Sequence, residues 1–250
     1  MILRIQGLEF RYKNVSVIKD ASFDVEEGEV LAILGRNGAG KTTLLKCLNH
    51  ILTPQKGTVQ VDGIDIRTMR PVHIARKMGW VPQHGEISRM KVYDLIMLGR
   101  KPYFRWEPTK EDHRKVEEAI TLLGLEDLSL RYADELSGGE FQMVQIVRAL
   151  AQDPRVILLD EPTSSLDIRN QHRLMAKIRQ IIHNSPRAAV MTMHDINLAL
   201  RYADKFLLLK DGYISAVGDR SVITPEKIQE VYDMQVRVVE AGGYPLVVPI

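Results

Sequence analysis

Residues 35 to 42 read Gly-Arg-Asn-Gly-Ala-Gly-Lys-Thr and match the pattern G-x-x-x-x-G-K-[ST] in full. Glycines let the backbone wrap closely around phosphate oxygens, and the free amide groups of a following helix favour an anion. Lys41 adds positive charge for the β- and γ-phosphates, and Thr42 offers a hydroxyl to Mg²⁺. The pattern predicts a nucleotide site, against the alternative of a glycine-rich turn without a ligand. The residues expected to contact the nucleotide are Gly35, Arg36, Asn37, Gly38, Ala39, Gly40, Lys41, Thr42 and Thr43.

A second chemical signal is the apolar run Val156 to Leu159, which ends in Asp160 and Glu161. Continuous apolar runs are typical of buried parallel strands, and open α/β sheets bind ligands beyond the carboxyl ends of their strands. We therefore expect Asp160 to belong to the Mg²⁺ shell and Glu161 to orient or deprotonate the attacking water. Two adjacent carboxylates favour hydrolysis over nucleotide storage. The alternative is that one of them only caps the following turn.

A third signal is Ser137, Gly138 and Gly139, which stand between Leu136 and Glu140 at the predicted start of a helix. Two glycines after a serine in this position form another anion site. The chain already has one phosphate loop for its own nucleotide. A second anion site is therefore explained if it binds the nucleotide of another subunit.

The elements that position these motifs follow from the hydrophobic pattern. Strand-sized apolar runs and helical patterns alternate in residues 1–85 and 152–224, which predicts an α/β core with a parallel sheet and crossover helices. Residues 86–151 have a helical pattern and are expected to form an inserted subdomain. Residues 225–250 are expected to add a helix and a Val-rich tail that packs as edge strands, with a regulatory tail as the alternative.

More specific boundaries follow from turn and cap signals. The predicted strands are 3–10, 21–25, 30–34, 78–83, 156–159, 188–192 and 206–209, with a hairpin over 58–65. The predicted helices are 41–52, 111–123, 141–150, about 169–183 and about 195–202.

The composition is that of a globular chain. Of the 250 residues, 45% are apolar and 26% are charged, which is sufficient for a large core. A net charge of +2 argues against a protein that coats nucleic acid. Cys47 is the single cysteine and is expected to be a buried, inert thiol. The N-terminal residues do not fit a signal peptide, and no apolar run approaches the ~20 residues of a membrane helix.

The segment Leu136-Ser137-Gly138-Gly139-Glu140 resembles the signature of the ABC ATPase family, LSGGQ or LSGGE. The resemblance covers nearly the whole chain, with the motifs in the family's order and spacing. It implies an α/β fold in which a RecA-like P-loop NTPase core carries an antiparallel β subdomain and an inserted α-helical subdomain.

The resemblance assigns further residues. Tyr12 takes the place of the aromatic that stacks on adenine, and Gln83 that of the glutamine that reaches Mg²⁺ and the attacking water. Asp167 ends the loop that crosses the dimer interface, and His194 matches the histidine that contacts the γ-phosphate. Each has a plain structural alternative: Tyr12 as a packed strand aromatic, Gln83 as a surface amide and His194 as a structural histidine.

The mechanism that the resemblance implies needs partners. Two copies bind head to tail, and each ATP lies between the phosphate loop of one copy and residues 137–139 of the other. Closure and hydrolysis are passed to transmembrane permease subunits at the cytoplasmic face of the membrane, and indirectly to a substrate-binding protein. No nucleic acid is expected as a partner.

Three stretches resemble importer ATPases for iron–siderophore complexes, haem and vitamin B12: 94–103, 167–171 and the C-terminal tail. Molybdate or tungstate import, an exporter and a non-transport ABC ATPase remain alternatives, as does a regulatory module that does not hydrolyse ATP. Phe141 and Met143 depart from the family's usual basic residues. Residues 84–90, expected to help form the groove for the permease's coupling helix, are also less typical.

The segment 96–103 also yields a prediction about coupling. Charge reversal at Arg100 or Lys101 is expected to uncouple transport while sparing the ATPase activity of the free subunit. Plain helix packing of this segment is the alternative.

Overall fold

The central sheet organises the molecule. The structure is a computed structural model that describes residues 1–85, 87 and 89–250. In it, six strands lie in the order β10-β9-β3-β8-β7-β6. All neighbours pair in parallel except β10, which is antiparallel to β9. The bounds are β3 Val30–Leu34, β6 Met78–Val81, β7 Val156–Asp160, β8 Ala188–Thr192, β9 Lys205–Lys210 and β10 Tyr213–Gly218.

Strand β3 shows how one sheet supports two cores. All five of its residues are buried. Side chains alternate between the faces of a strand, so Val30, Ala32 and Leu34 join one apolar cluster and Leu31 and Ile33 join the other. The continuous apolar runs that predicted β3, β7 and β8 are thus explained by burial on both faces.

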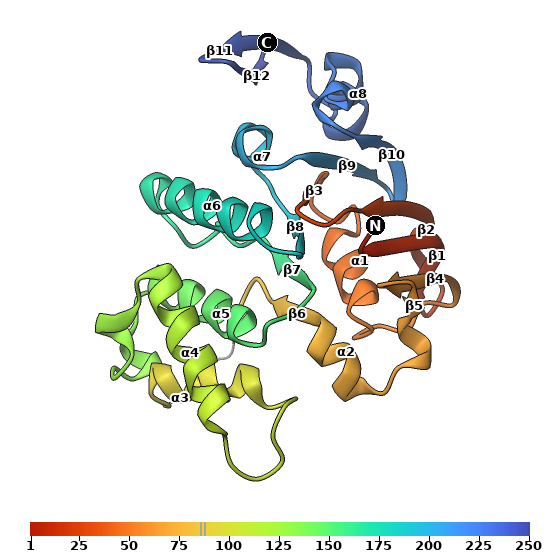
Figure 1. Ribbon diagram of the computed structural model, residues 1–250. Coiled ribbons are helices and arrows are strands. Elements are labelled where there is room, and N and C mark those ends of the chain that lie inside the picture. The colour runs from red at the N-terminus through yellow and green to blue at the C-terminus, as the bar shows by residue number, and fades with distance from the viewer. Residues whose placement is uncertain (86, 88) are drawn as a thin grey trace.

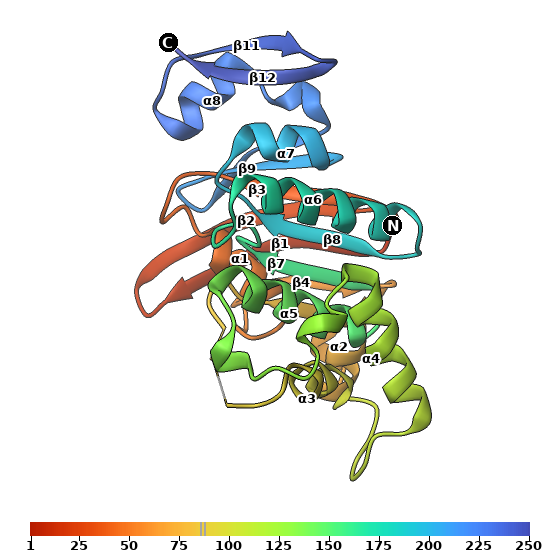
Figure 2. The same cartoon turned by 90° about the vertical axis from the view of Figure 1, so that its left-hand side faces the viewer.

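One face of the central sheet is covered by helix α1 and a second, antiparallel sheet in the order β2-β1-β4-β5 (Figure 1 and Figure 2). Its strands are β1 Leu3–Tyr12, β2 Val15–Val25, β4 Lys56–Val61 and β5 Ile64–Asp65. Helix α1, Lys41–Leu48, ends earlier than predicted because His50 has a φ of 57°, which is not helical.

Helices cover the other face. Helix α6, Ile168–His183, and helix α7, Ile196–Tyr202, join the cluster that also holds the helical segment. That segment contains α3 Val92–Met97, α4 Lys110–Leu123 and α5 Gly138–Ala151, with short 3-10 turns η2 Leu98–Arg100, η3 Glu126–Leu128 and η4 Ala133–Glu135. The predicted α/β core with an antiparallel sheet and inserted helices is confirmed, whereas the exact subdomain boundaries stay a prediction.

The C-terminal residues form helix α8, Pro225–Tyr232, and a hairpin of β11, Val236–Ala241, and β12, Tyr244–Pro249. Asn197 of α7 holds the hairpin by donating to the Val247 carbonyl at 3.1 Å and accepting from the Val247 amide at 2.8 Å. The tail forms strands as predicted, but they pair with each other in a separate two-stranded sheet and are not edge strands of the larger sheets.

Some elements were not predicted. Helix α2, Pro71–Lys77, the edge strand β10 and two 3-10 turns, η1 Ile66–Thr68 and η5 Arg220–Val222, are short and have no strong periodicity. Cys47 is fully buried as expected, and burial raises the pKa of its thiol to about 12. No helix in the part of the chain that the structure describes is both long and apolar enough to cross a bilayer.

Candidate functional site

The phosphate-loop residues connect β3 to α1. Gly35 has a φ of 156°, and a Cβ there would lie 2.3 Å from the Leu209 carbonyl oxygen. Gly40, with a φ of 105°, is the N-cap of α1. The Lys41 ammonium donates to the carbonyls of Gly35 at 2.7 Å and Arg36 at 3.1 Å. The loop therefore curves around the Lys41 side chain, as a phosphate cradle requires.

Lys41 is 6% exposed. Burial lowers the pKa of its ammonium, and the negative charges of Glu161 and Asp160 oppose this shift. A buried cation beside two carboxylates at the start of a helix forms a site whose charges suit a bound polyphosphate with a cation.

Asp160, at the end of β7, accepts two hydrogen bonds at the same oxygen. Thr42 donates to its Oδ1 at 3.0 Å, and Thr192 at the end of β8 donates to it at 2.7 Å. Parallel pairing of Asp160 with Thr192 brings these side chains to one edge of the sheet. The Thr42 hydroxyl and the Asp160 carboxylate are oxygen donors of the kind that Mg²⁺ prefers.

Glu161 adopts a left-handed φ of 49°, which costs a non-glycine residue roughly 1 kcal/mol or more. Its amide donates to the Thr192 hydroxyl at 2.8 Å. Gln83 Nε2 donates to Glu161 Oε2 at 2.5 Å, and His194 Nε2 contacts Glu161 Oε1. The carboxylate is held between the two side chains, and each of these three residues comes from a different part of the sequence.

These residues line one pocket of about 350 Å³. Its lining consists of Val17, Asn37, Gly38, Gly40, Lys41, Thr42, Thr43, Gln83, Glu161 and His194. The structure thus brings together most of the nucleotide-contacting residues predicted from sequence. Arg36 and Ala39 instead line a neighbouring pocket next to α8. Tyr12 lies outside both linings, is 46% exposed and packs edge-on against Phe10 at 4.8 Å.

Two residues of this region were missed by the sequence reasoning. Val17 is an ordinary strand residue with no chemical signal. Thr192 could have been found, because it is the only polar residue in the apolar run of β8 and ends that strand at the same edge as Asp160.

The Ser137–Gly139 motif lies in a separate cavity of about 430 Å³, which also includes Asp167. Ser137 caps α5: its hydroxyl accepts from the Glu140 amide at 3.3 Å and donates to the Glu140 carboxylate at 2.7 Å. Gly139 packs closely on the loop that ends at Asp167, because a Cβ there would lie 3.0 Å from Leu166 Cδ2. The two cavities have no lining residue in common.

A fourth hollow, which we call the α2–α5 cleft, has a volume of about 390 Å³. Its lining consists of Asn49, His50, Pro71, Ile74, Ala75, Met78, Trp80, Leu98, Gly99, Arg148, Ala149 and Gln152. The 84–90 stretch predicted to help form a docking groove follows β6, but Glu86 and Ser88 lie outside the described residues.

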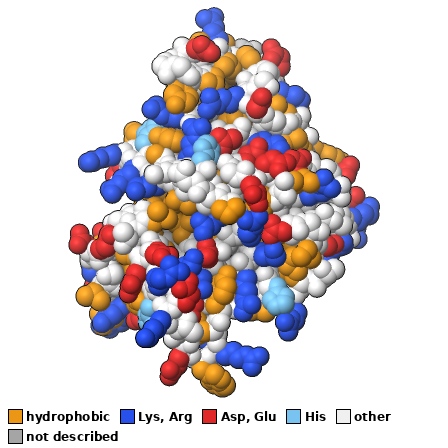
Figure 3. All heavy atoms as spheres, in the orientation of Figure 1, with side chains coloured by type: hydrophobic (Ala, Val, Ile, Leu, Met, Phe, Trp, Pro, Cys, Tyr) orange, Lys and Arg blue, Asp and Glu red, His pale blue; other side chains and the backbone are white. Residues whose placement is uncertain are grey.

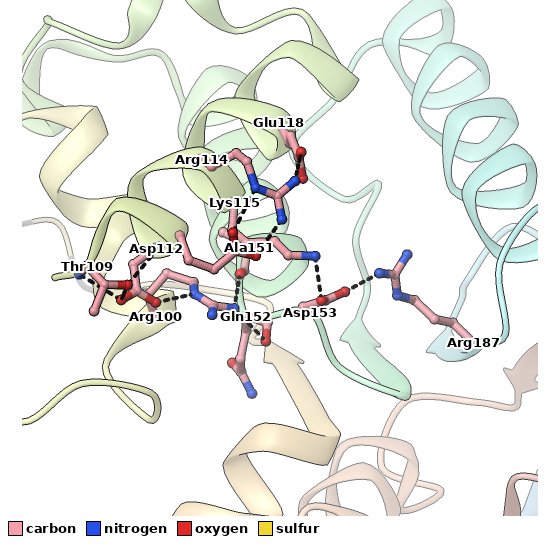
Figure 4. Close-up of polar contacts among 11 residues, drawn as sticks. Arg100, Thr109, Asp112, Arg114, Lys115, Glu118, Ala151, Gln152, Asp153 and Arg187 are labelled. Atoms are coloured by element: carbon pink, nitrogen blue, oxygen red, sulfur yellow. Dashed lines mark hydrogen bonds and ion pairs between the residues drawn. The ribbon is translucent and has the colours of Figure 1, made fainter.

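The side chain of Arg100 lies inside the protein and not on its surface. It is 4% exposed, its Nε donates to Asp112 at 2.9 Å, and its Nη1 donates to the Ala151 carbonyl at 3.0 Å (Figure 4). Arg100 is therefore an internal ion-pair partner and not a surface charge, as the packing alternative expects, and its effect on coupling stays a prediction. Lys101 is exposed.

A neighbouring ion bridge joins the helical segment to the core. Asp153 accepts from Lys115 of α4 at 2.7 Å and also pairs with Arg187, which precedes β8 (Figure 4). Burial alone would raise the pKa of Asp153, but these two cations hold it below its ordinary value.

The described residues contain no cluster of three or more His, Cys, Asp or Glu side chains that could hold a metal ion by themselves. The donor set beside the phosphate loop fits Mg²⁺ in a different way. Thr42 and Asp160 supply two oxygens, and a cation with so few protein ligands is usually completed by phosphate oxygens and water.

The sequence matches the model of a family described as ABC transporter over residues 18–164. It is 49% identical over 250 residues to an uncharacterized ABC transporter ATP-binding protein of Methanocaldococcus jannaschii, covering 100% of this chain and 98% of that protein. It is 36% identical over 260 residues to a hemin import ATP-binding protein of Gloeobacter violaceus, covering 100% and 94%.

Solved structures give the same result. An inward-facing ABC transporter described as metal-chelate type has a TM-score of 0.85 at 28% identity, over 100% of this chain and 96% of that chain. A bacterial ABC transporter cassette solved as a dimer has a TM-score of 0.79 at 26% identity, over 87% and 98%.

Proposed function

We propose that this chain, which belongs to the ABC transporter family and is one of its ATPase subunits, powers an importer for a metal chelate. The support for import comes from the hemin import relative, whose whole length this chain nearly covers, and the metal-chelate type transporter structure supports the class of cargo. Iron–siderophore, haem and cobalamin are the candidate cargoes, and molybdate or tungstate is a second class.

The observation that carries hydrolysis is the position of Glu161. Its carboxylate is held between Gln83 and His194 in the pocket that contains Lys41. In the proposed mechanism Lys41 and the loop amides bind the β- and γ-phosphates. Glu161 then orients the attacking water and accepts its proton, and His194 donates to the γ-phosphate.

Mg²⁺ would be held by Thr42, Asp160 and the carbonyl oxygen of Gln83, whose Nε2 is engaged with Glu161. When bound, it would neutralise phosphate charge as the bond to the leaving group breaks. Thr192 and Thr42 hold the Asp160 carboxylate in place for this role.

The proposed assembly contains two copies. Ser137, Gly138, Gly139 and Asp167 would face the nucleotide held by the phosphate loop of the partner copy. A transmembrane permease would dock a cytoplasmic helix in the α2–α5 cleft, which places the chain at the cytoplasmic face of the membrane. A substrate-binding protein would act on the other side.

The first test compares the wild type with Glu161→Gln in Mg²⁺-dependent ATP hydrolysis and in size-exclusion chromatography with ATP. We expect the variant to lose about 100-fold or more of its turnover, to keep ATP binding and to elute as a dimer. Glu240→Gln, on the exposed part of β11, is the matched control and should behave as wild type. Full turnover by Glu161→Gln would remove Glu161 from the catalytic role.

Import is tested separately, in proteoliposomes that contain the subunit, its permease and its substrate-binding protein. ATP-dependent accumulation of an iron–siderophore, haem or cobalamin supports the metal-chelate assignment. Accumulation of molybdate alone, or movement of substrate in the opposite direction, contradicts it.

A further inference from the structure

The loop between η2 and α4, residues 101–109, extends at the bottom of the molecule in both ribbon views (Figure 1 and Figure 2). We call it the aromatic loop, because it reads Lys-Pro-Tyr-Phe-Arg-Trp-Glu-Pro-Thr. Its Trp106 is 92% exposed, the most exposed of the large hydrophobic side chains in the described chain. A Trp in this position buries almost no area, so the fold gains little stability from it.

The base of the aromatic loop is firmly built. Arg76 of α2 donates from Nε to the Pro102 carbonyl at 3.0 Å. The Tyr103 ring is stacked by the Arg100 guanidinium at 3.8 Å and by that of Arg76 at 5.1 Å. These contacts anchor residues 102 and 103, close in sequence to the exposed Trp106.

The aromatic loop is also basic. It has two cations, Lys101 and Arg105, against one carboxylate, Glu107, and Lys110 follows as the first residue of α4. The two carboxylates that follow, Glu111 and Asp112, are already engaged with Arg114 and Arg100. Figure 3 shows hydrophobic side chains at this lower tip, with Lys or Arg side chains and an acidic side chain next to them.

The loop lies at the rim of the α2–α5 cleft. Leu98 and Gly99, which line the cleft, directly precede the loop, and α2 contributes both Ile74 to the cleft and Arg76 to the loop. The proposed function places the permease in this cleft, so the same side of the molecule would face the membrane.

We propose that the aromatic loop rests on the anionic headgroups of the bilayer beside the permease, with Trp106 in the interfacial layer. This inference rests on the proposed function for its orientation. Tryptophan is enriched at membrane interfaces, because its ring is apolar and its N–H is polar. Lys and Arg near an anionic leaflet add attraction that falls off within a Debye length. An exposed Trp in a loop of net positive charge fits this surface better than a dry protein interface.

The fluorescence of Trp106 tests the proposal, because Trp80 is the only other tryptophan and can be replaced by Phe. The Trp80→Phe variant is mixed with vesicles of phosphatidylcholine containing about one third phosphatidylglycerol. We expect a blue shift of the emission and protection from an aqueous quencher, both reduced by high salt. Flotation of the unaltered protein with the same vesicles gives a measure that does not depend on the Trp80 substitution.

Substitutions separate the loop from general charge effects. We expect Trp106→Ala to lower the vesicle partition coefficient by roughly tenfold, and Arg105→Gln by about fivefold. The matched control is Arg237→Gln on β11, at the opposite end of the molecule (Figure 1), which should bind as wild type. ATP hydrolysis by each variant confirms that it is folded.

Three results would overturn the proposal. The first is no emission shift with anionic vesicles, and the second is an equal loss of vesicle binding for Arg105→Gln and Arg237→Gln. The third is an emission shift that appears only when the permease is present in uncharged lipid. The last result would assign the aromatic loop to a protein contact. Because vesicle binding is measured without permease or cargo, it can fail while the import assignment holds, and the reverse is also possible.

Discussion

At the scale of single residues, Thr192 connects the two carboxylates of the site. Its hydroxyl donates to Asp160 and accepts from the amide of Glu161, and the residue is fully buried. One side chain thus fixes the expected metal ligand and also the strained backbone that aims the expected base. It touches no reacting atom, so we regard it as a positioning residue.

Thr192→Val tests this role, since the two side chains have nearly the same shape. Removing the hydroxyl leaves the Glu161 amide without its buried acceptor, which costs about 1–3 kcal/mol. We expect kcat to fall by roughly tenfold to a hundredfold, with a smaller change in KM for ATP. Thr192→Ser keeps the hydroxyl and should recover most of kcat. Equal kcat for Val and wild type, or equal defects for Val and Ser, would show that the hydroxyl does not position the site.

At the scale of elements, the junction of η2, α4 and α5 depends on the Arg100–Asp112 ion pair. Both side chains are nearly inaccessible to solvent. Burial alone would raise the pKa of Asp112, but hydrogen bonds from Thr109 and Arg100 hold it below its ordinary value. Arg100 also donates to the last turn of α5, so a single guanidinium joins three elements.

We therefore predict that Arg100→Glu lowers the free energy of unfolding by about 3–5 kcal/mol, because it buries two carboxylates without a cation. Chemical denaturation measures this, with Lys101→Glu as the exposed control that should stay within about 0.5 kcal/mol of wild type. The double variant Arg100→Met with Asp112→Leu should regain much of the stability. A fully stable Arg100→Glu that fails only in transport would restore the docking role.

The elements also show what could be inferred from sequence. The strands β3, β7 and β8 were predicted nearly residue by residue, because burial on both faces leaves a continuous apolar run. The phosphate-loop and acidic motifs predicted a shared site for Lys41 and Glu161, the family resemblance added His194, and all three line one pocket. The burial of Arg100 was beyond such reasoning, since its partner Asp112 lies twelve residues away in a different helix and the pairing depends on tertiary packing.

At the scale of the whole molecule, the proposed assembly treats two separate cavities of the chain as halves of one site. The pocket with Lys41 and the cavity with Ser137 and Gly139 share no lining residue. A head-to-tail dimer would complete both, and it is the closed symmetric arrangement in which each copy contributes the same two surfaces. The tail hairpin lies at the far end from the aromatic loop (Figure 2), which leaves the bottom of the molecule for the membrane partner.

Complementation between variants tests the composite site. Lys41→Ala removes the charge of the phosphate loop, and Ser137→Arg fills the cavity that contains Ser137 and Gly139. Each variant alone should therefore lack turnover. In a mixed dimer, the intact phosphate loop of the Ser137→Arg copy faces the intact signature of the Lys41→Ala copy, which restores one site. Random pairing of equal amounts restores about a quarter of the wild-type sites. We expect the mixture to regain ATP hydrolysis of up to about a quarter of the wild-type level, in proportion to the formation of mixed dimers.

A mixture that stays inactive while mixed dimers are seen by mass spectrometry would have two explanations. Either both sites of a dimer must be intact for turnover, or the two copies do not share the halves of a site. Lys41→Ala mixed with wild type separates these outcomes, because it also contains dimers with one intact site.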